Sequence, residues 1–233
     1  MIEKDLFGQA LHDYWHNLQP EDMITWTNLT EPEVLPTAYL FRTYDEMPVS
    51  EQKALQLARG TILDVGAGSG THSLWLQKQQ HDVTALELSP ISCQLMKDRG
   101  IQKIVQANFF DYKGPKYDSI LFLMNGIGIV EKAQYTDKLF QKLKNLLKPN
   151  GQAFIHSSDL KYLYETGGGY TMPQAGYYGD VQFFVSYKNE VESFNWTYID
   201  EQTLKSFAQQ NGFKAEKIIE SELGDFLLKV SIK

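Results

Sequence analysis

The chain has little cysteine and no long apolar run. Its 233 residues contain a single cysteine, Cys93, so no intrachain disulfide can form. The longest uninterrupted apolar run, 120–124, has five residues, whereas a membrane span needs about 20. The start of the chain, with Glu3, Lys4 and Asp5, lacks the basic and apolar segments of a signal peptide. We therefore expect a cytoplasmic protein without a membrane-spanning segment.

A concentration of positive charge is also missing. The 22 Lys and Arg residues are outnumbered by 29 Asp and Glu residues, which gives a net charge of -7, and the basic residues are scattered along the chain. Nucleic-acid binding depends on a basic surface that neutralises phosphates. We therefore expect no nucleic-acid partner. The hydrophobic content of 42% is typical of a globular domain.

Short apolar runs rich in β-branched residues alternate with helical patterns after residue 48. This alternation predicts a parallel sheet with helices on both faces. The expected strands are 61–65, 82–87, 103–107, 119–124, 152–156, 215–220 and 226–232. Only a short turn at Gly224 joins the last two strands, and it cannot hold a crossover helix, so these strands must be antiparallel. The sequence predicts a doubly wound, seven-stranded, three-layer α/β fold with an antiparallel C-terminal strand.

Two segments fall outside this alternation. We expect residues 1–47 to form an N-terminal helical cap on a main domain that covers 48–233. An insertion at about 160–199 carries seven of the 13 tyrosines and the glycine run 167–169, with Gly168 at its centre. Residues that alternate with a period of two predict a hairpin within the insertion. We expect the cap and the insertion at the carboxyl edge of the sheet, where ligands bind in such folds.

A glycine-rich turn follows the first expected strand. Residues 64–70 read Asp-Val-Gly-Ala-Gly-Ser-Gly, and glycines there let the backbone approach a ligand closely. Glu87 comes 21 residues after Gly66 and ends the second strand, where a carboxylate accepts hydrogen bonds from a ribose. A dinucleotide fingerprint would need a glycine at position 71, where this chain has Thr71. The acidic Asp64, directly before the glycines, suits a ligand with a positively charged amine better than one with phosphates. A nucleoside with an amino group is therefore favoured over a dinucleotide.

From about residue 60 onward the sequence resembles the class I S-adenosylmethionine-dependent methyltransferases. Residues 63–70 look like the first motif of that family, and Glu87 matches its ribose-binding acid. The resemblance implies a Rossmann-like methyltransferase fold and S-adenosyl-L-methionine as the cofactor, with no metal ion. It also implies that Leu88 lies against the adenine ring. Asn108, followed by Phe109, stands where the family commonly has an acid that contacts the adenine, and Asp111 is the alternative.

The resemblance extends to the methionine end of the cofactor. Asn125 matches the place where the family's chain passes that end. Arg42, in the N-terminal cap, is a candidate partner for the cofactor's carboxylate, and the alternative is a surface arginine in an ion pair. The full set of cofactor-binding residues that we expect is Arg42, Asp64, Gly66, Ala67, Gly68, Gly70, Glu87, Leu88, Asn108, Phe109 and Asn125.

Methyl transfer from a sulfonium requires in-line attack by a nucleophile, so positioning supplies most of the catalysis. We expect no catalytic triad. If the acceptor must lose a proton, the candidate bases are His156, Asp159 and the tyrosines of the insertion, and the sequence does not choose among them. We expect a small-molecule acceptor. The alternatives are a protein side chain as acceptor and a catalytically silent, cofactor-binding regulatory protein.

Overall fold

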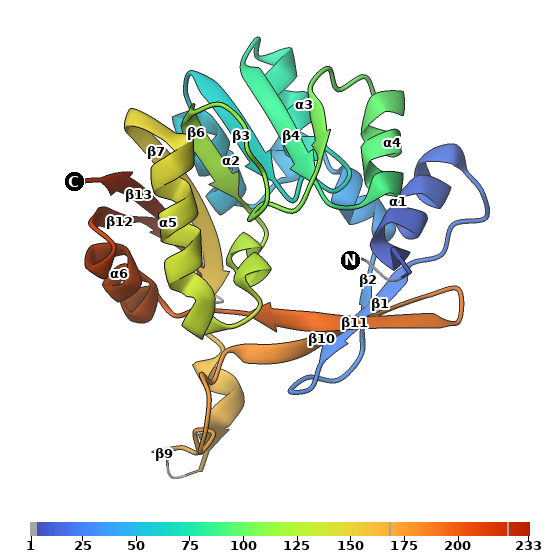
Figure 1. Cartoon of the computed structure of the whole chain (residues 1–233). Helices are drawn as coiled ribbons and strands as arrows, with labels where there is room; N and C mark the ends of the chain where they lie inside the picture. Colours follow the sequence, from blue (N-terminus) through green and yellow to red (C-terminus); the bar gives the residue numbers. More distant parts are fainter. Residues whose placement is uncertain (1–3, 168, 223) are drawn as a thin grey trace.

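A computed structural model describes residues 4–167, 169–222 and 224–233, so Gly168 of the predicted glycine run and Glu3 lie outside the described residues. The larger of its sheets has seven strands in the order β12-β13-β7-β6-β3-β4-β5 (Figure 1). These strands are β3 (Thr61–Val65), β4 (Asp82–Glu87), β5 (Ile104–Gln106), β6 (Tyr117–Phe122), β7 (Leu147–Ser158), β12 (Phe213–Glu220) and β13 (Asp225–Ile232). The predicted seven-stranded α/β fold is confirmed.

The pairing of the strands also follows the prediction. Strands β3, β4, β5, β6 and β7 pair in parallel, whereas β13 lies between β7 and β12 and is antiparallel to both. Each parallel strand therefore ends at the same edge of the sheet. This carboxyl edge carries the glycine turn after β3, Glu87 at the end of β4 and Asn125 shortly after β6.

Helices cover both faces of this sheet. The helices α2 (Val49–Leu57), α3 (Thr71–Lys78) and α4 (Pro90–Asp98) contribute apolar residues to clusters on one face. The helices α5 (Thr136–Leu146) and α6 (Glu201–Gln210) pack on the other. Leu139, Phe140 and Leu143 of α5 are fully buried, as the apolar stripe of that helix requires. None of the helices within the described ranges is long and apolar enough to span a membrane.

A second, four-stranded antiparallel sheet has the order β11-β10-β1-β2. Its strands are β1 (Met23–Thr27), β2 (Glu33–Leu35), β10 (Asp180–Tyr187) and β11 (Glu190–Thr197). It lies beyond the end of β7, at the carboxyl edge of the larger sheet (Figure 1). Trp196 of β11 packs directly on Gly128, where a Cβ atom would come within 1.9 Å of the indole ring. The second sheet is therefore in contact with the segment that follows β6, at this edge.

The segment before residue 48 is not purely helical, which corrects the expectation of a helical cap. It contains α1 (Leu6–His16) and the 3-10 helices η1 (Thr37–Phe41) and η2 (Tyr44–Glu46), but also β1 and β2. The strand β1 pairs with β10 of the insertion through contacts such as Trp26 with Phe184. The N-terminal segment and the insertion thus build one sheet together.

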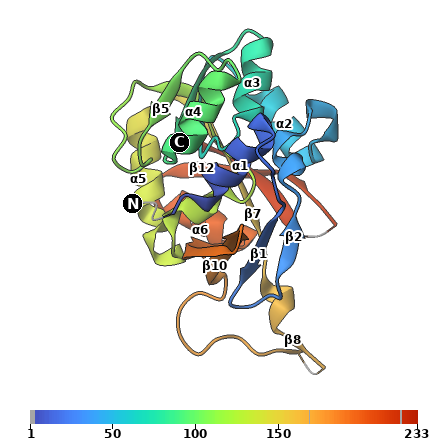
Figure 2. The same cartoon turned by 90° about the vertical axis from the view of Figure 1, so that its right-hand side faces the viewer.

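Smaller elements complete the chain. The 3-10 helices η3 (Gly126–Val130) and η4 (Ala133–Tyr135) connect β6 to α5. Within the insertion, η5 (Lys161–Tyr164) is followed by the short pair β8 (Glu165–Thr166) and β9 (Gly169–Tyr170). This part extends away from the rest of the molecule in both views (Figures 1 and 2).

Candidate functional site

The glycine turn after β3 presents an open concave side. Gly66, Gly68 and Gly70 have positive φ angles of 70°, 55° and 78°, a conformation that glycine adopts without steric strain. A Cβ atom would meet nothing within 4 Å at Gly66, and only the Gly66 carbonyl oxygen, at 4.0 Å, if placed on Gly68. At Gly70 it would clash with Ile101, at 2.2 Å. Two glycines therefore keep space open, and the third packs the turn onto its neighbours.

Glu87 is held beside this turn. One carboxylate oxygen accepts a hydrogen bond from the Gly68 amide at 2.8 Å, and the other accepts from the Leu88 and Ser89 amides at 2.6 and 2.9 Å. Burial raises the pKa of Glu87, and these backbone donors act in the opposite direction. A carboxylate offers about four acceptor positions, so Glu87 has one left for a hydroxyl, and accepting both hydroxyls of a ribose would displace one of the three amides.

A buried polar cluster lies behind the turn. Arg42 donates through one terminal nitrogen to both carboxylate oxygens of Glu51, at 2.6 and 2.5 Å, and His72 Nε2 lies 2.6 Å from the same carboxylate. Although burial alone would raise it, these partners hold the pKa of Glu51 below its usual range. Arg42 is only 6% exposed. Arg42 is thus in an ion pair, as the second of the two expectations stated, but this pair lies in the interior rather than at the surface.

Two atoms of this region bear on ligand binding. The Nε atom of Arg42 is buried and has no hydrogen-bond partner, and leaving such a donor unpaired is unfavourable. Asp64 is 2% exposed and accepts a hydrogen bond from the Ser73 hydroxyl at 2.7 Å. Burial raises the pKa of Asp64. An anionic group near Arg42 and a cationic group near Asp64 would each be stabilised here.

Asn125 is held rigidly after β6. It has a left-handed backbone, with φ 56°, and its side-chain oxygen accepts from the Ser158 hydroxyl at 2.8 Å. The backbone amide of Asn125 donates to His156 Nδ1 at 2.9 Å. The proton of a neutral His156 is therefore on Nε2, which faces the Asp225 carboxylate at 3.1 Å. Burial lowers the pKa of His156, and Asp225 opposes that shift. Both ring nitrogens are in use, so His156 orients Asn125 rather than standing free as a base.

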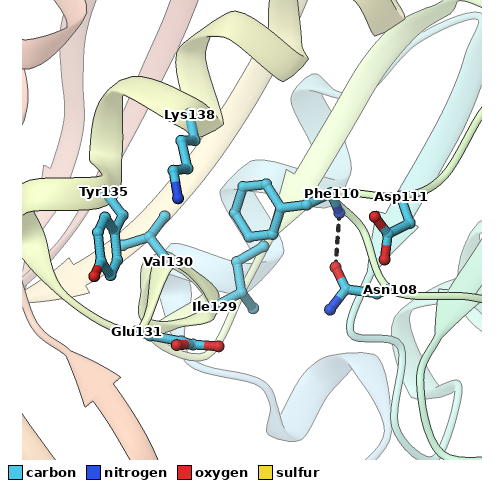
Figure 3. A pocket seen from close by; sticks show the side chains of 8 residues that line it. All are labelled: Asn108, Phe110, Asp111, Ile129, Val130, Glu131, Tyr135 and Lys138. Atoms are coloured by element: carbon cyan, nitrogen blue, oxygen red, sulfur yellow. Dashed lines mark hydrogen bonds between the residues drawn. The ribbon is translucent and has the colours of Figure 1, made fainter. Parts of the chain in front are cut away.

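The expected adenine-binding residues divide between the surface and the core. Leu88 is 38% exposed, whereas Phe109 is 5% exposed and packs edge-on against Phe122, with ring centroids 5.1 Å apart. Asn108 accepts a hydrogen bond from the Phe110 amide at 2.8 Å (Figure 3). The side chain of Phe109 therefore belongs to the core, and any ligand contact of this residue must come from its backbone.

A cavity of about 400 Å³ opens beside Asn108 (Figure 3). Its walls come from the loop after β5, from η3 and from the start of α5, and they include Asn108, Phe110, Asp111, Ile129 and Lys138. Asn108 and Asp111, the two alternatives for the adenine contact, both line it. Phe110 is a residue that the sequence analysis missed, because two adjacent phenylalanines give no signal of which one faces the core.

Three of the other candidate bases, Asp159, Tyr177 and Tyr178, are also engaged. Asp159 accepts from the Tyr178 hydroxyl at 2.7 Å, and Asp200 accepts from the Tyr177 hydroxyl at 2.6 Å. Burial, reinforced by these acidic neighbours, raises the pKa of both tyrosines. Neither phenol is therefore an anionic base near neutral pH. Tyr39, which the sequence did not single out, lies over the Arg42 guanidinium at 4.1 Å.

Together the fold and the site define a Rossmann-like protein that binds a nucleoside at the carboxyl edge of its sheet. The glycine turn leaves room for a ligand, Glu87 has unused acceptor capacity, and the buried Nε–H of Arg42 is a donor without a partner. These donors and acceptors fit the ribose and the amino-acid end of S-adenosylmethionine.

Comparisons with known proteins identify the family. A family described as a methyltransferase domain matches residues 38–218. An S-adenosylmethionine-dependent methyltransferase from Bacteroides fragilis, solved with S-adenosyl-L-homocysteine, is 40% identical and superposes with a TM-score of 0.91 over 100% of this chain and 96% of that one. The chain belongs to the S-adenosylmethionine-dependent methyltransferases, and its cofactor is S-adenosylmethionine. The resemblance seen in the sequence is confirmed.

More distant relatives are methyltransferases as well. The sugar N-methyltransferase KedS8 from Streptoalloteichus sp. shares the fold, with a TM-score of 0.52 and 16% identity over 78% of this chain and 84% of that one. The cypemycin N-terminal methyltransferase from Streptomyces sp. is 25% identical over 112 residues. That match spans 46% of this chain and 46% of the relative, which is less than half of its length.

Proposed function

We propose that this chain transfers the methyl group of S-adenosylmethionine to a small-molecule amine. In this proposal Glu87 accepts hydrogen bonds from the ribose hydroxyls, and the turn 66–70 receives the nucleoside. Arg42 donates its unpaired Nε–H to the cofactor's carboxylate, and Asp64 lies toward its amino group. Leu88 and Asn108 border the adenine, Phe109 contributes only backbone, and Asn125 passes the methionine end.

The position of the second sheet supports a compact acceptor. It lies across the carboxyl edge and touches it where Trp196 packs on Gly128. In this proposal the acceptor binds at the same edge, beside Asn125. A second sheet across this edge favours a small molecule over a folded protein surface as the acceptor.

The chemistry of the site supports nitrogen as the acceptor atom. S-adenosylmethionine supplies an activated methyl group, and the chain positions a nucleophile in line with it. His156 uses both ring nitrogens, and the phenols of Tyr177 and Tyr178 have raised pKa values. A neutral amine needs no base before it attacks, whereas a hydroxyl does. One similar protein is named as a sugar N-methyltransferase and another as an N-terminal methyltransferase of cypemycin.

The experiment measures S-adenosylhomocysteine formation by the purified chain with matched pairs of acceptors. Each pair consists of an amino sugar or amino-acid amide and its hydroxyl analogue, and mass spectrometry reports the transferred methyl group. We expect turnover of amines and at least tenfold less with the hydroxyl analogues. Preferential turnover of a hydroxyl analogue would contradict the amine proposal.

Two further outcomes separate the remaining alternatives. Methylation of a peptide N-terminus or side chain, with no small amine accepted, would identify a protein acceptor. Cofactor binding without turnover of any acceptor would favour the catalytically silent, regulatory alternative. Glu87→Ala is the control, because any background reaction should persist in it, whereas turnover by the site should fall.

A further inference from the structure

One face of the four-stranded sheet packs on the rest of the molecule. Met23, Val185 and Tyr187 are buried on this face, where they form a cluster with Leu6 and Ala10 of α1. Because side chains of a strand alternate between the two faces, the intervening residues of the same strands point to the opposite side. We call that opposite side the outer face.

The outer face carries exposed apolar side chains on three of its strands. Ile24 pairs with Val34 on one side and Ser186 on the other, and Ser186 pairs with Val191, so these residues form a row across all four strands. Val34 is 64% exposed, Val191 46% and Ile24 41%. A sheet face that meets water usually carries polar side chains, so this exposure is unusual.

Two aromatic rings continue the surface in the next row. Trp26 and Phe184 are directly opposite each other on β1 and β10, and their rings stack with centroids 5.2 Å apart and an interplanar angle of 5°. Contiguous exposed apolar patches on a folded chain mark interaction sites. Aromatic residues are enriched in the buried centres of such sites.

The outer face also carries little charge. Besides its five apolar residues, its outward positions at 182, 186, 193 and 195 are serine, asparagine or glutamine. The one charged outward position is Asp180 at the start of β10, whose carboxylate accepts hydrogen bonds from the Ala133 amide and the Thr197 hydroxyl. The chain as a whole is 22% charged, with a net charge of -7. Two copies of the chain repel each other over most of their surfaces, and an apolar face with little charge is where that repulsion is least. A highly charged partner has little to pair with here.

We propose that the outer face binds the same face of a second copy of this chain, related by a two-fold axis. Strand spacing of about 4.8 Å and a rise of about 3.3 Å per residue give the face a flat area of about 400 Å². Side chains stand up from it, so pairing two faces removes on the order of 1,000 Å² from water. This area is near the lower limit for a specific dimer, and the expected dissociation constant is micromolar.

Sedimentation equilibrium of the full chain, at about 1 to 100 µM, tests this proposal independently of the methyl acceptor. We expect a monomer–dimer equilibrium that Val34→Glu weakens at least tenfold, because the dimer would bury the new charge. Val49→Glu is the matched control. Val49 is 54% exposed on α2, away from the outer face, so its substitution should leave the equilibrium unchanged.

Circular dichroism and thermal unfolding check that both variants fold. We expect both to fold because the substituted positions are exposed. Two results would overturn the proposal. One is a wild-type chain that stays monomeric throughout the concentration range, in which case another molecule must cover the outer face. The other is a dimer that Val34→Glu and Val49→Glu affect equally, which would place the interface elsewhere.

Discussion

Gly68→Val tests whether the open side of the glycine turn holds the cofactor. Gly68 has φ 55°, and its missing Cβ would approach nothing in the protein more closely than 4.0 Å. Valine there introduces backbone strain, about 1 to 2 kcal/mol for a left-handed L residue, but no clash with the protein. Its side chain instead enters the space assigned to the cofactor. We expect a folded protein whose affinity for S-adenosylhomocysteine falls at least tenfold.

The expected effect can be read as a thermal shift. S-adenosylhomocysteine at about 100 times its dissociation constant stabilises the wild-type fold by about 2.7 kcal/mol. For a domain of this size, each kcal/mol corresponds to roughly 2 to 4 °C, so the wild-type midpoint should rise by about 5 to 10 °C. In Gly68→Val a tenfold loss of affinity should remove about half of this rise, and a larger loss should remove more of it.

Gly212→Val is the control for backbone strain. Gly212 has φ 78°, has no atom within 4 Å of its missing Cβ, and follows α6 next to the edge strand β12. Gly212→Val should lower the unfolding midpoint by about as much as Gly68→Val does, because both introduce the same backbone strain. It should keep the full ligand-induced rise in that midpoint. The same rise in Gly68→Val and Gly212→Val would refute the assignment of the turn to the cofactor.

Three further predictions concern the carboxylate, the buried ion pair and the histidine. Glu87→Ala should weaken S-adenosylhomocysteine binding at least tenfold in calorimetry, and unchanged affinity would remove Glu87 from the site. Arg42→Ala should lower the free energy of unfolding in urea by about 3 to 5 kcal/mol, because it removes the guanidinium that donates to both carboxylate oxygens of Glu51. A loss below about 1 kcal/mol would mean that this pair contributes as little as a surface ion pair. Burial lowers the pKa of His156 below its unfolded value of 6.5, so the unfolded state takes up a proton that the folded state does not, and stability should fall as the pH drops below 6.5. His156→Gln should reduce that slope, and equal slopes for both proteins would contradict the shift.

Much of the larger sheet could be predicted from the sequence because its signals are local. The apolar run 120–124, which begins within β6, and the glycine turn after β3 each lie within a few adjacent residues. The antiparallel placement of β13 follows from chain length alone, because the turn at Gly224 is too short for a crossover. The spacing between the glycine turn and Glu87 likewise depends on one strand–helix–strand unit.

The second sheet could not be predicted from local patterns. Its central pairing joins Trp26 to Phe184, across more than half of the chain, and β2 has only three residues. A short strand before residue 48 gives no sign that its partner lies in a distant insertion. The apolar outer face was hidden for the same reason, because its residues come together only when β1 pairs with β10.

The buried polar cluster was missed for a related reason. Arg42, Glu51 and His72 come from the segment after η1, from α2 and from α3, and each would be read alone as a surface residue. Their burial depends on three elements that meet behind the glycine turn. The sequence pointed to Arg42 through its family resemblance, and the structure adds Glu51 as the residue that orients it.

The most direct test is a crystal structure of the complex with S-adenosyl-L-homocysteine. We expect both ribose hydroxyls within hydrogen-bond distance of the Glu87 carboxylate, and the ligand's carboxylate against Arg42 Nε. A nucleoside bound away from residues 66–70, with Glu87 still bonded only to backbone amides, would contradict the proposed site.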